Sequence, residues 1–88
     1  MNIPQQIGFS ILQQDIDNGR PSDPQNCPIS RALTRLFPGR RIETGMTFTR
    51  IDTVRFDLPI NLITWIHDFD CRRPTQPTTG VIKRSDAV

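Results

Sequence analysis

The hydrophobic positions of this chain change their spacing several times, and each change predicts a new element. Near the start, Ile7, Phe9 and Ile11 alternate with small or polar residues, which predicts a half-buried strand. Residues 13–18 then have room for a single helical turn, which Gly19 would end. We therefore expect the chain to open with a strand followed by a short helix.

A continuous apolar stripe marks the clearest helix of the chain, which we expect to begin at Pro28. Proline suits the first helical position, because its missing N–H would have no partner there. Pro38 and Gly39 would end the helix. The stripe follows the spacing of one helix face and consists of Ile29, Ala32, Leu33, Leu36 and Phe37. We expect the opposite face to consist of Ser30, Arg31, Thr34 and Arg35.

Two alternating stretches in the middle of the chain predict an antiparallel hairpin. In the first stretch, Met46 and Phe48 alternate with threonines. In the second, Val54, Phe56 and Leu58 alternate with charged residues. A short connection around residues 51–53 would join them into a hairpin with one apolar face.

A second helix is predicted from Pro59 to about Asp70. The apolar stripe of this segment consists of Leu62, Trp65, Ile66 and Phe69, broadened by Ile60 and Ile63. Because β-branched residues lower helix propensity, a strand is the competing interpretation. The length of the segment and the proline at its start favour a helix. We expect Trp65 and Phe69 to pack in the core, and an oligomer or partner interface is the alternative role for them.

These elements predict an α+β fold, in which a small antiparallel sheet packs against two helices. We expect residues 1–88 to form one domain with an ordered core at about residues 5–71. We expect residues 72–79 to be an extended connector, residues 80–84 to add an edge strand, and residues 85–88 to be disordered. A chain this short has a thin core. A homodimer in which two copies share one core is therefore a possible assembly.

The basic residues change this picture, because ten of the eleven are arginines. The guanidinium group is planar and binds carboxylates and phosphates, although codon usage in a GC-rich genome would produce the same bias. The net charge is only +2, and interspersed acidic residues weaken the case for a general nucleic-acid surface. The candidates for contact with an anion or a partner, which could equally form a solvated face, are Arg31, Arg35, Arg40, Arg41, Arg72 and Arg73.

Cys27 directly precedes Pro28 and therefore falls at the N-cap of the first long helix. The unpaired N–H groups and the dipole at this position can stabilise a thiolate. A nucleophile also needs a base, which His67 would supply if Asp68 or Asp70 oriented it. A buried, inert thiol is the ordinary state of a free cysteine. We expect that state for Cys27, with a structural role at the helix start and no catalytic residues.

Other constellations of side chains are incomplete. His67 and Cys71 are four residues apart and Cys27 could add a third zinc ligand, but the fourth is missing. A disulfide between Cys27 and Cys71 would need an oxidising setting. Residues 15–19 resemble the start of a calcium loop, but their glycine comes one position early and Asn26 stands where glutamate is needed. We therefore predict neither a metal nor a cofactor.

No segment of the sequence indicates a membrane or a secretory route. The chain lacks an apolar stretch of about 18 residues, and its N-terminal region does not resemble a signal peptide. Two cysteines are too few for a disulfide framework. We therefore expect no membrane contact and a cytoplasmic location.

Three stretches of the chain resemble a group of small, mostly uncharacterised proteins from bacteriophages and prophages. They are DIDNG at residues 15–19, CPISRAL at residues 27–33 and LPINLITWIHDFD at residues 58–70. The corresponding patterns are D-I-x-x-G, C-P-[IV]-[AS]-x-A-[LI], and L-P-x-x-[IV] in a helix that ends in F-D, with Leu62 in place of the isoleucine or valine of the third pattern. The likeness covers about residues 7–77, and Cys71 departs from the glycine-like residue expected there. The resemblance implies a phage context and a helix start at Cys27 and Pro28, but no activity.

Two classes of function follow from the sequence. The first is a non-enzymatic phage accessory protein that binds and inhibits a protein of the bacterial host, for instance a component of a defence system. The second is a binder of nucleic acid or of a nucleotide through the candidate arginines. Clustering of these arginines on one surface would favour the second class, and their dispersal would favour the first.

Overall fold

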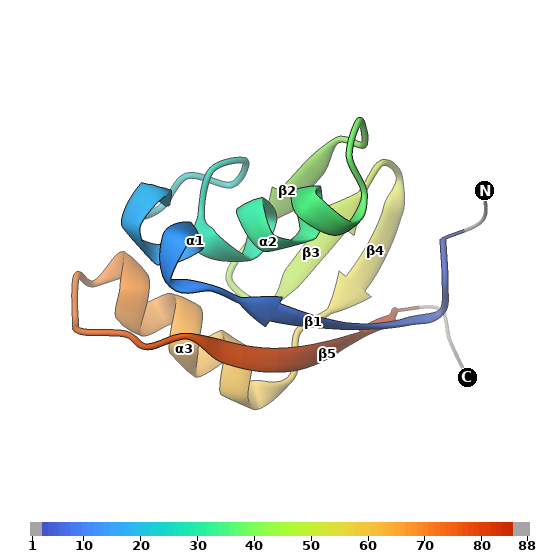
Figure 1. Ribbon diagram of the computed structural model, residues 1–88. Coiled ribbons are helices and arrows are strands. Elements are labelled where there is room, and N and C mark those ends of the chain that lie inside the picture. The colour runs from blue at the N-terminus through green and yellow to red at the C-terminus, as the bar shows by residue number, and fades with distance from the viewer. Residues whose placement is uncertain (1–2, 86–88) are drawn as a thin grey trace.

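Five antiparallel strands in the order β1-β5-β4-β3-β2 form a sheet in the computed structural model, which describes residues 3–85 (Figure 1). The strands are β1 (Gln6–Ile11), β2 (Ile42–Thr44), β3 (Phe48–Ile51), β4 (Val54–Asp57) and β5 (Thr78–Arg84). The helices are α1 (Gln13–Asn18), α2 (Pro28–Leu36) and α3 (Ile60–Asp70). The predicted α+β class, with a small antiparallel sheet and helices, is confirmed.

The core lies between one face of the sheet and helices α2 and α3. Helix α2 contacts both edge strands, β1 and β2, because the sheet curls around it. Leu62 of α3 packs against the backbone of β5 at Gly80. The sheet contributes Ile7, Phe9, Ile11, Ile42, Ile51, Phe56 and Ile82 to the core. The apolar face of the hairpin is thus covered by helices of the same chain, and a homodimer stays a prediction.

The start of α2 is confirmed in detail. Cys27 has extended backbone dihedral angles and occupies the N-cap, and Pro28 is the first helical residue. Ile29, Ala32 and Leu33 are buried, as the stripe predicts.

Two side chains of α2 differ from the prediction. Ser30, expected on the solvent face, is fully buried. Its hydroxyl group is satisfied inside the protein, since it donates to Pro24 O at 2.5 Å and lies 2.7 Å from Thr44 Oγ1. Leu36, expected in the core, is 51% exposed. The helix ends at this residue, and the next side chain, Phe37, packs against the core instead.

The predicted hairpin forms from β3 and β4, but the prediction of which residues of its first strand face inward was wrong. Thr49 and Ile51 are buried, whereas Phe48 lies on the outer face and Met46, just before the strand, is exposed. A shift of one residue exchanges the two faces of a strand. The buried Thr49 hydroxyl lies 2.9 Å from Thr44 Oγ1, and this contact satisfies a polar group inside the core.

The C-terminal strand is not at an edge of the sheet. Strand β5 lies between β1 and β4, and it begins at Thr78, inside the predicted connector. Ser85 follows it and is also held, since its N–H donates to Arg55 O at 3.0 Å and its hydroxyl to Asp57 Oδ1 at 2.9 Å. The rest of the predicted disordered tail, residues 86–88, lies outside the described residues.

Segment 60–70 is a helix rather than the competing strand, and Pro59 is its N-cap. Trp65 is partly buried against the core and stacks on Phe69, with 5.9 Å between the ring centroids. Its indole N–H donates to Gln76 O at 2.9 Å, so the connector to β5 is bound to α3. No helix in the described range, residues 3–85, is long and apolar enough to cross a membrane.

Candidate binding surfaces

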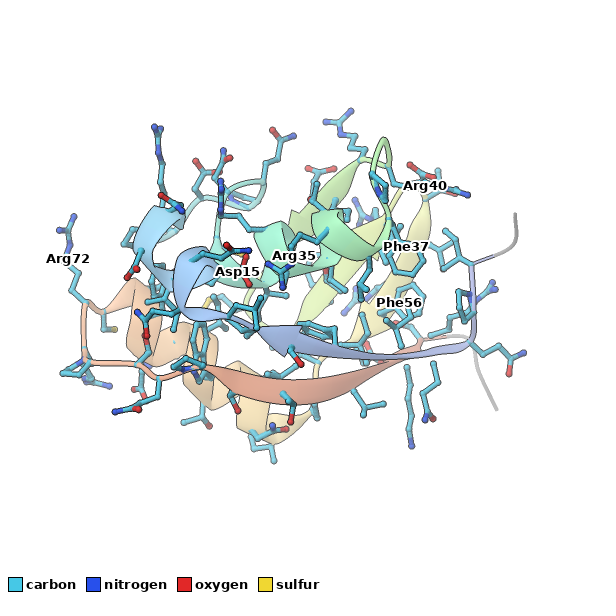
Figure 2. All side chains as sticks on the ribbon, in the orientation of Figure 1. Asp15, Arg35, Phe37, Arg40, Phe56 and Arg72 are labelled. Carbon is cyan, nitrogen blue, oxygen red and sulfur yellow. The ribbon has the colours of Figure 1, made fainter. Side chains whose placement is uncertain are left out.

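The six candidate arginines lie in three separate parts of the molecule. Arg31 and Arg35 belong to α2, residues 40–41 connect α2 to β2, and residues 72–73 lie just beyond the C-cap of α3. Figure 2 shows Arg35, Arg40 and Arg72 spread across the width of the molecule. Together they do not form one continuous basic surface.

Among the described residues, four of these arginines form ion pairs. The pairs are Arg35 with Asp15, Arg40 with Asp52 at 2.7 Å, Arg41 with Glu43 at 3.2 Å and Arg73 with Asp68 at 3.0 Å. The hydrogen bond from Arg40 lowers the pKa of Asp52, and the hydrogen bond to Asp15 raises the pKa of Arg35. A carboxylate beside each guanidinium group weakens its attraction for phosphates of a nucleic acid.

The thiol of Cys27 is buried, as we expected from the sequence. The side chain is 3% exposed, and Ser30 N–H donates to its Sγ at 3.5 Å. Burial raises the pKa of Cys27 despite this hydrogen bond. The thiol is therefore protonated at neutral pH and is a poor nucleophile.

The residues that a Cys–His–Asp arrangement would require are engaged elsewhere. Asp70 Oδ1 accepts a hydrogen bond from Ser22 N–H at 2.8 Å, and Asp68 pairs with Arg73. His67 Nε2 instead lies 3.8 Å from the sulfur of Cys71. Neither carboxylate is in place to orient His67 as a general base.

Cys27, His67 and Cys71 line the same pocket of about 470 Å³. Among residues 3–85, however, no three potential ligands of the His, Cys, Asp and Glu types are placed to hold a metal ion. Both cysteines are free thiols, Cys27 buried and Cys71 exposed. The disulfide considered for this pair is not formed.

Alkylation with iodoacetamide at neutral pH is expected to modify the exposed Cys71 and to leave Cys27 unmodified. The reason is that burial both shields Cys27 and raises its pKa. Intact-protein mass spectrometry would show one adduct on the native chain and two in denaturant. Rapid modification of Cys27 in the native protein would contradict this assignment, and the Cys27→Ala variant identifies which thiol reacts.

A cluster that the sequence analysis missed lies on the outer face of the hairpin, opposite the core. The guanidinium carbon of Arg55 lies 4.4 Å from the centroid of the Phe48 ring, and that of Arg50 lies 5.6 Å away. Both distances are within the range of cation–π interactions. We call Phe48, Arg50 and Arg55 the outer-face cluster.

The ring of Phe48 is held in place before any partner binds. It packs against the backbone of Gly45, where an added Cβ would lie 2.6 Å from the ring carbon Cε1. Gly45 N–H also donates to Phe48 O at 2.8 Å and closes the tight turn between β2 and β3. A side chain fixed in this way loses little conformational entropy on binding.

The two arginines of the outer-face cluster stand directly opposite each other in the register of β3 and β4. Like charges in such a cross-strand pair destabilise a sheet. Asp57 lies 3.7 Å from Arg55 and offsets part of this repulsion. Within residues 3–85, Arg50 forms no ion pair. The alternation of F-T-R and V-R-F places all three side chains on one face, but only after β3 is assigned the correct register.

A comparison of this chain with protein families, with curated proteins and with solved structures finds no match.

Proposed function

We propose that this chain is a non-enzymatic binding protein that recognises a partner protein through the outer-face cluster. The observation that carries the proposal is the Phe48 ring, half-buried and flanked by the guanidinium groups of Arg50 and Arg55. Aromatic residues and arginine are the residue types that dominate the energetic centres of protein interfaces. Here they project from two paired strands, which support them more rigidly than a loop would.

The charges around the outer-face cluster favour a protein partner over a nucleic acid. Glu43 stands opposite Arg50 in the sheet, and Asp57 stands opposite Phe48. These carboxylates would repel a phosphate backbone, whereas a protein surface can present both signs of charge to match them. The dispersal of the six candidate arginines, and the ion pairs that four of them form, support the same choice.

The resemblance to phage proteins supports a bacterial host protein as the partner. In this proposal the chain acts in the cytoplasm of the host cell, where it inhibits its target by occupying a surface that the target needs. A component of a defence system is one such target. The alternative, an arginine-mediated binder of nucleic acid or of a nucleotide, uses surfaces away from the outer-face cluster.

Affinity capture from a bacterial host lysate tests the proposal. We expect the wild-type chain to retain a host protein at near-stoichiometric level and Phe48→Ala to lose it, because the ring supplies the anchor of the interface. Arg72→Ala is the matched control, since Arg72 is exposed and lies beyond α3, outside the cluster. Quantitative mass spectrometry of the eluates measures the retained protein.

The proposal is wrong if the Phe48→Ala variant, folded by circular dichroism, retains the same protein at the same level as the wild type. Retention of labelled DNA or RNA at about 50 mM salt, lost steeply as salt rises, would instead support the nucleic-acid alternative.

A further inference from the structure

A polar pocket of about 550 Å³ lies between α1, α2 and the loop that connects them. Arg31 and four carboxamide side chains line it, those of Gln14, Asn18, Gln25 and Asn26. The pocket is on the helical side of the sheet, so it is separate from the outer-face cluster. No part of the proposed function uses it.

An ion pair with an almost fully buried carboxylate forms one wall of this pocket. Asp15 is 3% exposed, and its side chain accepts hydrogen bonds from Arg35 and, at 2.8 Å, from Leu12 N–H (Figure 2). The guanidinium group of Arg35 also donates to Ser10 O at 3.1 Å. Asp15 and Arg35 therefore neutralise each other, and both are held by the backbone.

Arg31 gives the pocket a net positive charge. The charged residues that line the pocket are Arg31, Arg35 and Asp15, and their formal charges sum to +1. The Nε atom of Arg31 is buried, and no hydrogen-bond partner for it is found among the described residues. A buried donor without a partner costs about 1–3 kcal/mol. Because this Nε is closed to solvent, an acceptor from outside the chain would pair with it only if the Arg31 side chain turns towards the pocket, and such a turn would remove this cost.

Two of the carboxamides are already oriented. Asn18 Nδ2 donates to Gln14 O at 2.9 Å, and Asn26 Nδ2 donates to Asp23 Oδ2 at 3.2 Å. Because the Nδ2 groups donate these hydrogen bonds, the Oδ1 atoms stay available as acceptors. The pocket thus combines one unpaired cationic donor with fixed polar groups.

We propose that this pocket binds the oxyanion of a small polar molecule, either a carboxylate or a phosphate, on Arg31. The planar guanidinium group can donate two parallel hydrogen bonds to either oxyanion. The carboxamides bind polar groups on the rest of the ligand. The volume of the pocket and its single net charge fit a small molecule of mononucleotide size or below.

Titration of the ¹⁵N-labelled protein with adenosine monophosphate, glutamate and uncharged adenosine tests this site by NMR. We expect saturable shifts of α1, α2 and loop amides with at least one of the two anions below about 10 mM, and none with adenosine. The monophosphate and glutamate arms distinguish a phosphate ligand from a carboxylate ligand. Arg31→Gln is expected to weaken binding at least about tenfold, or 1.4 kcal/mol.

Arg72→Gln is the control, because it removes one positive charge outside the pocket and should leave the affinity unchanged. Arg31→Lys keeps the charge but lacks the forked donor, and it replaces Arg31→Gln if that variant does not fold. Absence of saturable shifts with both anions would overturn the proposal. Shifts that persist unchanged in the folded Arg31 variant would overturn it as well.

Discussion

Replacement of Phe56 by alanine is expected to lower the free energy of unfolding by about 3–5 kcal/mol. Phe56 is 0% exposed and stands on β4 near the middle of the sheet, with its ring in the core. The loss combines the transfer free energy of the ring with the cavity left behind, which surrounding strands can close only in part. A domain of this size has a total stability on the order of 4–13 kcal/mol, so the variant is expected to lose a large fraction of its stability.

Urea denaturation followed by tryptophan fluorescence measures this effect. Phe37→Ala is the matched control, because Phe37 is partly exposed at the end of α2 and contacts the same core (Figure 2). We expect its loss to be less than half of that for Phe56. Equal losses at the two positions would contradict the described placement of the core.

Gly80→Ala is expected to destabilise the protein by about 1–3 kcal/mol through overpacking. An added Cβ at Gly80 would lie 2.4 Å from Leu62 Cδ1 and 2.8 Å from Leu62 Cγ. Leu62 is fully buried on α3, so its side chain has little room to move aside. The close approach of α3 to β5 therefore depends on a residue without a side chain at this position.

The neighbouring strand provides the control for this prediction. An added Cβ at Gly8 of β1 would meet its nearest atom, Val81 Cγ2, at 4.0 Å, which is ordinary contact. Gly8→Ala should therefore leave the midpoint of thermal unfolding almost unchanged. The double variant Gly80→Ala/Leu62→Ala should be more stable than the sum of the two single losses predicts. Strict additivity would show that the two residues do not compete for space.

Hydrophobic spacing was sufficient to predict β1, α2 and α3, because the apolar residues of each element repeat at one regular spacing along its whole length. Pro28 and Pro59 also marked the starts of the two long helices within one residue. Cys27 could be assigned to the N-cap on this basis alone. These features are local, and local sequence determines them.

The errors arose where burial depends on residues far apart in the chain. Ser30 and Thr49 are polar but buried, because each bonds to Thr44, which local spacing cannot reveal. Strand β5 was assigned to an edge because its short apolar run gives no information on its neighbours. Pairing with β1 and β4 depends on contacts across the whole length of the chain.

The candidate sites were less predictable from the sequence than the helices and strands. The sequence showed that arginines dominate the basic residues, but it could not show which of them find a carboxylate. Asp15 pairs with Arg35 across twenty residues, which leaves Arg31 as the unpaired neighbour in that pocket. The outer-face cluster was missed because Phe48 was assigned to the core. When the alternation of a strand is assigned one residue out of step, every outward side chain is placed on the wrong face of the sheet.

Calorimetric titration of the captured partner with the purified chain tests recognition through the outer-face cluster most directly. We expect Phe48→Ala and Arg55→Ala each to weaken binding at least about tenfold, with a modest dependence on salt between about 50 and 500 mM. An affinity that is unchanged in the Phe48→Ala variant would contradict the account. The same contradiction would follow if binding were lost steeply with salt, as for a polyanion.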